Sequence, residues 1–232
     1  MKNCILLHLH HQDLWPEFWA CLENIKNENL DIFVTVNNPQ TEWYEDIVSK
    51  CTDVFLVENK GMDFGGFLFA YNKIKHIDYK LIIKLHGKKR NPYLSVPPDE
   101  WRKELYKSLI SSKEAFESMT SRFEANDRLY MYGSKLCYRN DPYNHPWMIE
   151  NIPAVNVVNR ILNLNTLSEY KFIAGTMFAV SKTYLELLFN NKEMEIYNIL
   201  QPYAPNNGSV AHGLERLIGA NVGAFGGVME LI

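Results

Sequence analysis

The sequence predicts an α/β protein, a single domain in which a mainly parallel central sheet is flanked by helices. Short β-rich runs alternate with amphipathic segments in the first third of the chain, which is the pattern of a parallel sheet covered by helices. The β-rich runs are nearly continuous in apolar residues, as expected for strands buried on both faces. With 232 residues, 47% of them apolar, the chain is long enough for one large core and short for two.

Strands and helices are expected to alternate in the first half of the chain. The strands are predicted at residues 5–10, 31–36, 54–57 and 79–85. The first helix follows Asp13, which can cap it, and Pro16 lies in its first turn, where the missing N–H costs little. Two more helices are expected at residues 42–50 and 64–76.

The second half is less regular because prolines interrupt it. Loops are predicted at residues 88–98 and 139–153, each of which contains three prolines. Residues 139–153 are expected to form a loop rather than a helix. Helices are expected at 99–110, 112–126, 184–189 and 210–218, strands at 129–132 and 172–180, and a closing segment at 222–229. No repeat or linker marks a boundary, so residues 1–232 are expected to form one domain.

Composition and charge exclude several classes of protein. The formal net charge of -3 removes the simplest electrostatic argument for a nucleic-acid partner. The four cysteines lie far apart, which favours neither a zinc knuckle nor a disulfide framework and indicates a reducing compartment. No stretch approaches the roughly 20 apolar residues of a membrane span. We therefore expect a cytoplasmic protein with no membrane span.

Polar side chains follow the predicted strands at the edge where open α/β sheets bind ligands. The strongest set follows the fourth strand: Lys84 and His86 alternate within an otherwise apolar run, and three basic residues, Lys88, Lys89 and Arg90, come directly after it. Such a cluster suits an anionic ligand, because fixed cations can neutralise its charge. A solvated basic turn is the alternative.

Other segments give weaker signals. The glycine-rich stretch 59–67 fits neither the dinucleotide fingerprint nor the Walker pattern, and Asp63 within it can simply cap a helix. His8 and His10 share one face of a strand, but no further ligand spacing supports a metal there. On the last predicted helix, His212, Glu215 and Arg216 share one side, where they form either a general base or a surface ion pair.

Five blocks occur in order along the chain: residues 10–15 (HHQDLW), 59–63 (NKGMD), 84–89 (KLHGKK) followed by Trp101 and Arg102, 174–178 (AGTMF) and 208–216 (GSVAHGLER). Together they resemble the rhamnan synthesis protein F family of bacterial polysaccharide glycosyltransferases. The resemblance implies a nucleotide-sugar-binding fold similar to glycosyltransferase type A. It implies a nucleotide-binding half at residues 1–90 and an acceptor-side half at 91–232.

The resemblance also implies an activity and its partners. The expected reaction moves a sugar, L-rhamnose, from a nucleotide-sugar donor, dTDP-rhamnose or a UDP-sugar, to a glycan or lipid-linked glycan acceptor, with inversion. Peripheral association with a membrane is left open. Two alternatives remain: a non-catalytic module that binds a nucleotide sugar or glycan, and transfer of glycerophosphate or another phosphodiester.

Site residues are assigned by combining the resemblance with the pattern. The fold usually places an Asp-x-Asp metal motif at the end of the fourth strand, whereas this chain has Lys84, Leu85 and His86. We therefore expect cations to bind the donor diphosphate and no essential cofactor, with Mn²⁺ or Mg²⁺ left open. Asn207 stands where relatives often carry Asp, so the base is placed at Glu215. The expected roles are Glu215 and His212 for catalysis; Lys84, His86 and Lys88 for the diphosphate; His10, Asn59, Gly61 and Asp63 for the nucleotide; and Gly175, Thr176 and Trp147 for the sugar or acceptor.

Overall fold

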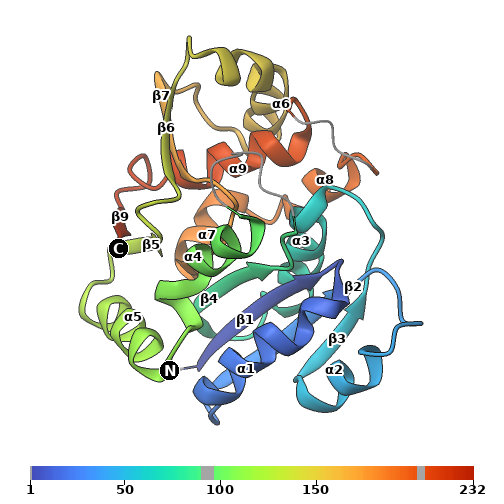
Figure 1. Cartoon of the computed structure of the whole chain (residues 1–232). Coiled ribbons are helices and arrows are strands. Elements are labelled where there is room, and N and C mark those ends of the chain that lie inside the picture. The colour runs from blue at the N-terminus through green and yellow to red at the C-terminus, as the bar shows by residue number, and fades with distance from the viewer. Residues whose placement is uncertain (1, 90–96, 203–206) are drawn as a thin grey trace.

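A seven-stranded sheet runs through the molecule in the order β3-β2-β1-β4-β8-β5-β9 (Figure 1). This computed structural model describes residues 2–89, 97–202 and 207–232. The strands are β1 (Lys2–Leu9), β2 (Leu30–Val36), β3 (Asp53–Leu56), β4 (Tyr79–His86), β5 (Leu129–Gly133), β8 (Phe178–Ser181) and β9 (Val228–Leu231). Only β8 runs against its neighbours β4 and β5; the other pairs are parallel. The predicted α/β class with a mainly parallel sheet is confirmed.

Helices cover both faces of this sheet. On one face lie α1 (Trp15–Ile25), α4 (Pro98–Ile110) and α5 (Lys113–Ala125), and Phe18 of α1 meets Tyr106 of α4 at 5.5 Å between ring centroids. On the other lie α3 (Met62–Ile74), α7 (Lys182–Phe189) and α8 (Glu193–Asn198), where Tyr71 and Phe189 pack together. The short α2 (Tyr44–Lys50) contacts β3, and a 3-10 turn, Gln12–Leu14, precedes α1.

A smaller unit stands beside the main sheet, toward the top of Figure 1. It contains the antiparallel pair β6 (Tyr138–Pro142) and β7 (Glu169–Ile173), with α6 (Pro146–Leu162) and α9 (Val210–Ala220). Helix α9 packs against both β7 and α6. Buried side chains of this unit belong to the same hydrophobic cluster as those of the main sheet, so residues from both halves of the chain build one core.

The prediction of a loop over residues 139–153 is wrong, because this segment holds most of β6 and the start of α6. Pro142 ends the short strand, and Pro146 occupies the first turn of α6, where an N–H would have no partner in any case. Pro153 lies inside α6 and removes one helical hydrogen bond. Packing of α6 on α9 stabilises the helix despite that loss.

The single strand predicted at residues 172–180 is also wrong. The structure has two strands in different sheets, β7 ending at Ile173 and β8 beginning at Phe178. Between them Gly175 and Thr176 both have positive φ, +89° and +58°, outside the β region of a regular strand. The predicted closing segment at residues 222–229 is a series of turns that leads into β9.

Residues 90–96 of the predicted loop, and with them Arg90, lie outside the described residues. All four cysteines are free. Within the described ranges, no helix is both long and apolar enough to cross a bilayer.

Close packing of α9 on β7 gives a test of the fold. A Cβ at Gly219 would lie 2.5 Å from the Lys171 carbonyl oxygen and 2.7 Å from Phe172 Cα, both backbone atoms that cannot move aside cheaply. Gly219→Ala should lower the free energy of unfolding by about 2 kcal/mol. Gly223→Ala is the matched control, since nothing lies within 4 Å of its Cβ position. Equal melting temperatures for the two variants would contradict this packing.

Candidate functional site

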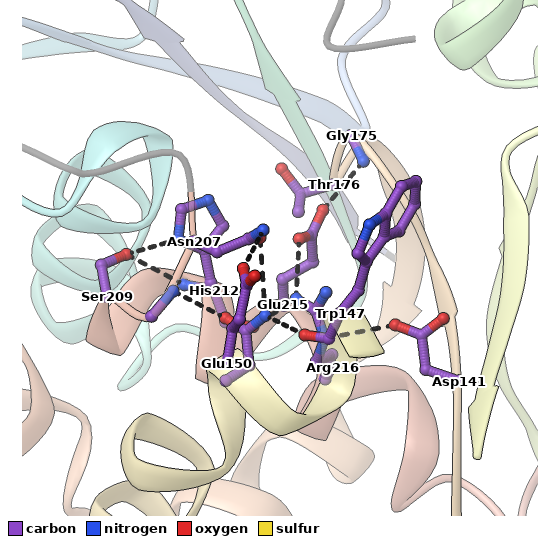
Figure 2. Close-up of polar contacts among 12 residues, drawn as sticks. Asp141, Trp147, Glu150, Gly175, Thr176, Asn207, Ser209, His212, Glu215 and Arg216 are labelled. Carbon is purple, nitrogen blue, oxygen red and sulfur yellow. Dashed lines mark hydrogen bonds and ion pairs between the residues drawn. The ribbon is translucent and has the colours of Figure 1, made fainter. Parts of the chain in front are cut away.

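A pocket of about 400 Å³ lies where β4 ends, between the start of α3, the turn after β7, and α9. Its wall joins residues that are far apart in the sequence: Met62, Asp63, Phe64, Lys88, Trp101, Trp147, Phe172, Ala174, Gly175, Thr176, Asn207, Ala211, His212, Glu215 and Arg216. Both halves of the chain contribute to this wall. Figure 2 shows part of it, with Glu215, His212 and Arg216 rising from one helix.

Lys84 lies behind the pocket wall rather than in it. The side chain is 1% exposed, and its ammonium donates to Asp63 Oδ2, to the Thr176 carbonyl at 2.9 Å and to Thr176 Oγ1 at 3.1 Å. These three bonds use all the donors of the ammonium. A diphosphate ligand could reach Lys84 only after this arrangement opened.

Asp63 is the acidic partner in that arrangement. Burial alone would raise its pKa, but His86, the Lys84 ammonium and hydrogen bonds from Lys84 and Thr176 outweigh burial and hold the pKa well below its usual range. Thr176 Oγ1 donates to Asp63 Oδ2 at 2.6 Å. The carboxylate, whose side chain is 12% exposed, therefore stays charged at neutral pH.

His86 is a buried neutral imidazole. Its Nε2 lies 2.7 Å from the Gly175 carbonyl, to which it donates. Burial, together with the neighbouring Lys84 and Lys88, lowers the pKa of His86 to about 3 against the opposing influence of Asp63. At neutral pH it supplies an N–H group and no positive charge.

Glu215, like Asp63, is a carboxylate of the pocket wall. Its Oε1 accepts the Gly175 N–H at 3.0 Å, and its Oε2 lies 3.6 Å from Arg216 Nη1. Burial raises the pKa of Glu215, with Arg216, the Gly175 N–H and Lys88 acting in the opposite direction. The side chains of Glu215 and Arg216 are 16% and 5% exposed, so they are not a surface pair.

His212 precedes Glu215 by one helical turn. Ser209 caps α9 by accepting the His212 backbone N–H, and the same hydroxyl lies 2.8 Å from His212 Nδ1. Burial, then the nearby Arg216, lowers the pKa of His212 to about 4. The ring is neutral at physiological pH.

Lys88 is the member of the predicted cationic set that lines the pocket. Its backbone carbonyl accepts a hydrogen bond from Arg102 at 2.8 Å. Arg102 is itself buried and binds both oxygens of Glu17, at 2.8 and 2.6 Å. The backbone at Lys88 is thus bonded to the Arg102–Glu17 ion pair, while the Lys88 ammonium has no ion-pair partner in the described part of the structure.

Three of the predicted nucleotide-binding residues lie outside the pocket wall. His10 is exposed and its Nδ1 lies 3.0 Å from Asn37 Oδ1. Gly61 precedes α3 at φ +63°, and its N–H donates to Gln201. Asn59, two residues before Gly61, is exposed. Their proposed roles stay predictions. Gly175, Thr176 and Trp147 lie in the pocket wall, and their role toward the sugar or acceptor also stays a prediction.

Two wall residues, Arg216 and Trp101, were given no role in the site from the sequence. Arg216 stacks over the Phe172 ring, 5.0 Å from its centroid, and lies 3.4 Å from Asp141 of β6. Trp101 lines the pocket from the first turn of α4. Trp101 could have been found from the sequence, because it closely follows the basic stretch. The contacts of Arg216 could not, because only the tertiary structure brings Asp141 and Phe172 to it.

The residues near the end of β4 do not fit a divalent metal. Lys84 and His86 stand where the predicted fold class usually has an acidic pair, and Asp63 Oδ2 is already bound by Lys84 and Thr176. Of the residues in the described ranges, no group of three or more His, Cys, Asp and Glu is arranged to hold a metal ion. Metal independence of any activity stays a prediction.

Comparison with known proteins assigns the family. The Rhamnan synthesis protein F family matches residues 1–223, and the chain belongs to this family, as its five sequence blocks indicate. No curated protein matches.

Two solved structures are similar. One is S. aureus TarS 1–349, with 10% identity, a TM-score of 0.47, and coverage of 95% of this chain and 55% of that one. The other is a candidate nucleotide-diphospho-sugar transferase from Desulfovibrio desulfuricans G20, with 13% identity, a TM-score of 0.28, and coverage of 45% and 53%. The chain aligns with about half the length of each of these structures.

Removal of the Lys84 ammonium should strongly destabilise the protein. Lys84→Met leaves the Asp63 carboxylate buried without its cation, at an expected cost of about 3–5 kcal/mol. Because the folded pKa of Asp63 is depressed, its stabilisation is present above about pH 4 and is lost as the pH falls further. The difference in stability between wild type and Lys84→Met should therefore narrow in acid, measured by urea unfolding at several pH values.

Lys80→Met is the control for this prediction. Lys80 lies on the same strand but pairs at 3.9 Å with Asp127, which is almost fully exposed. Its loss should cost at most about 1 kcal/mol. A similar small loss for Lys84→Met would contradict the assigned pairing with Asp63.

Proposed function

We propose that the chain is a glycosyltransferase that moves a sugar, L-rhamnose, from a nucleotide-diphosphate donor to a glycan acceptor with inversion at the anomeric carbon. The family is that of rhamnan synthesis protein F, which supports a role in building a polysaccharide. The observation that carries the proposal is the pocket at the end of β4, whose lining includes Glu215 and Lys88 with Trp101 and Trp147. A base, a cation and aromatic faces are the groups that this reaction needs.

In the proposed step, Glu215 Oε2 takes the proton of the acceptor hydroxyl. The acceptor oxygen forms a bond to the anomeric carbon as the bond from that carbon to the diphosphate oxygen breaks, and the electron pair leaves with the diphosphate. Lys88 stabilises the charge that develops on the leaving group. The raised pKa of Glu215 suits a base, because it makes the carboxylate a better proton acceptor.

His212 supports the step as a hydrogen-bond donor rather than a second base. Ser209 Oγ already accepts the backbone N–H of His212, so we assign the hydroxyl proton to the bond with Nδ1. In the neutral ring the proton then resides on Nε2. This N–H is available to an oxygen of the donor or acceptor.

A non-catalytic binding module is the second candidate, and Asn207 favours it. Asn207 lies in the pocket wall, where its amide donates to Glu150 at 2.8 Å. An amide cannot take a proton, so a mechanism that required a carboxylate at this position would fail here. The proposal requires that Glu215 alone serve as the base.

A donor panel tests the proposed function. Thermal melting with dTDP, UDP, GDP and their sugars should identify a stabilising ligand, and donor turnover is then measured with wild type and Glu215→Gln. We expect Glu215→Gln to keep donor affinity and to lower kcat by about 10²–10⁴-fold. Activity should persist in chelator. Donor binding without turnover in wild type would support the binding module, and manganese-dependent turnover would contradict the cationic site.

Lys88 should contribute to the affinity of the protein for its donor. Lys88→Met removes the pocket cation and is expected to weaken binding of the nucleoside diphosphate about tenfold by calorimetry. Lys89→Met is the control, because Lys89 pairs with Asp13 and is absent from the pocket wall. Equal affinities of the two variants for the nucleoside diphosphate would indicate that the diphosphate binds at another part of the surface.

A further inference from the structure

We propose that Asp63, Lys84 and His86 are positioning residues for the transfer step: they hold the Gly175–Thr176 turn, whose N–H orients and stabilises the Glu215 carboxylate. This inference rests on the proposed function. It gives Lys84 and His86, which the sequence analysis assigned to the diphosphate, a different task that they perform through the turn and without touching the donor.

The turn has an unusual backbone. Gly175 and Thr176 follow each other at φ +89° and +58°, and the turn is closed by the Thr176 N–H, which donates to the Ile173 carbonyl at 3.2 Å. A β-branched residue is rarely found at positive φ, and such a conformation persists only where the surroundings hold it. The sequence by itself therefore does not explain this turn.

Side chains from two other elements, β4 and α3, fix this turn by hydrogen bonds. His86 of β4 donates to the Gly175 carbonyl at 2.7 Å, and Lys84 of the same strand donates to the Thr176 carbonyl at 2.9 Å. Asp63 of α3 accepts the Thr176 hydroxyl at 2.6 Å. Both carbonyls and the hydroxyl of the turn are thus fixed by side chains of β4 and α3.

Packing confines the same turn from a third side. A Cβ at Gly175 would lie 2.8 Å from Leu105 Cδ1 and 3.1 Å from Trp101 Nε1, both of α4. The peptide of Gly175 therefore has little freedom to rotate. Its N–H points to Glu215 Oε1 at 3.0 Å, as the dashed line in Figure 2 shows.

The ionised form of Glu215 depends on this N–H because the charges of its other neighbours partly cancel one another. Arg216 and His212 are on its own helix, with Asp141 of β6 beyond Arg216. Lys88 follows β4, Asp63 comes from α3, and Lys84 and His86 lie behind the turn. The neutral His212 contributes no charge, and the Asp63 charge is matched by Lys84. The Gly175 N–H is the backbone group that stabilises the ionised form directly.

Neither Lys84 nor His86 is placed to bind the donor itself. Both are absent from the pocket wall, and both direct their donors to the turn. Loss of the His86 donor would leave the buried Gly175 carbonyl unpaired and free the turn to shift. The Glu215 carboxylate would then lose part of its hydrogen bond, and a higher pH would be needed to ionise it.

The experiment compares His86→Leu, which removes the donor, with His86→Gln, whose amide N–H can replace it. His8→Leu is the matched control: His8 is the register partner of His86 on β1, is equally buried at 6%, and bonds to Thr35 rather than to the turn. The readouts are dTDP affinity by calorimetry, the dependence of kcat on pH, and titration of the Glu215 carboxyl carbon by NMR, with the signal assigned through Glu215→Gln.

His86→Leu should lower kcat about tenfold while dTDP affinity stays within twofold of wild type. The acidic limb of its kcat profile and the Glu215 NMR midpoint should both move to higher pH, because the lost N–H had favoured the ionised form. His86→Gln should return the acidic limb of the kcat profile and the Glu215 NMR midpoint to their wild-type pH. His8→Leu should leave the Glu215 midpoint unchanged.

Two results would overturn the positioning role: an unchanged Glu215 midpoint in His86→Leu, or a tenfold loss of dTDP affinity in that variant, which would return His86 to the donor site. Absence of turnover in wild type with every donor would instead contradict the proposed function. The NMR comparison still decides the positioning role in that case, because it needs no substrate.

Discussion

The buried bond between Lys84 and Asp63 is the interaction on which the arrangement of the site depends. A lysine with 1% exposure is costly unless its charge is matched and its donors are used, and here Asp63 and Thr176 do both. The bond links the central strand β4, the helix α3 and the turn between β7 and β8. These three elements come from separate parts of the chain, and the pocket opens at the point where they meet.

Helix α9 brings the opposing set of groups to the same place. Ser209 caps its first turn, and the following turns direct His212, Glu215 and Arg216 toward the pocket. The helix approaches its neighbours closely because of two glycines: a Cβ at Gly213 would lie 2.9 Å from the backbone of α6, and Gly219 allows similar contact with β7. The reacting side of the pocket is therefore built on rigid secondary structure rather than on a loop.

The charges around the pocket are of both signs, and the way they are paired determines which ligands the pocket can bind. Lys84 is compensated by Asp63, and Arg216 lies between Glu215 and Asp141. Lys88 is left as the positive charge in the wall without an ion-pair partner among residues 2–89, 97–202 and 207–232. A negatively charged ligand is expected to approach from the Lys88 side, while Glu215 lines the pocket with its Oε1 bonded to the Gly175 N–H.

The sequence alone determined the α/β class, the order of the strands and helices in the first half, and the family. These follow from local periodicity and from blocks of neighbouring residues, both of which are readable without tertiary contacts. The sequence also indicated the correct region of the site, because buried strands that end in polar residues mark the ligand-binding edge of such a sheet.

Only the tertiary structure decided which of those polar residues reach the pocket. Lys84 and His86 looked like free cations in sequence, but their burial and their bonds to a turn some ninety residues away remove them from the pocket wall. The break between β7 and β8 and the helix across Pro153 were missed for a related reason. A positive φ at Thr176 and a proline inside α6 are unfavourable locally, and long-range hydrogen bonds and packing, which no local pattern records, stabilise both.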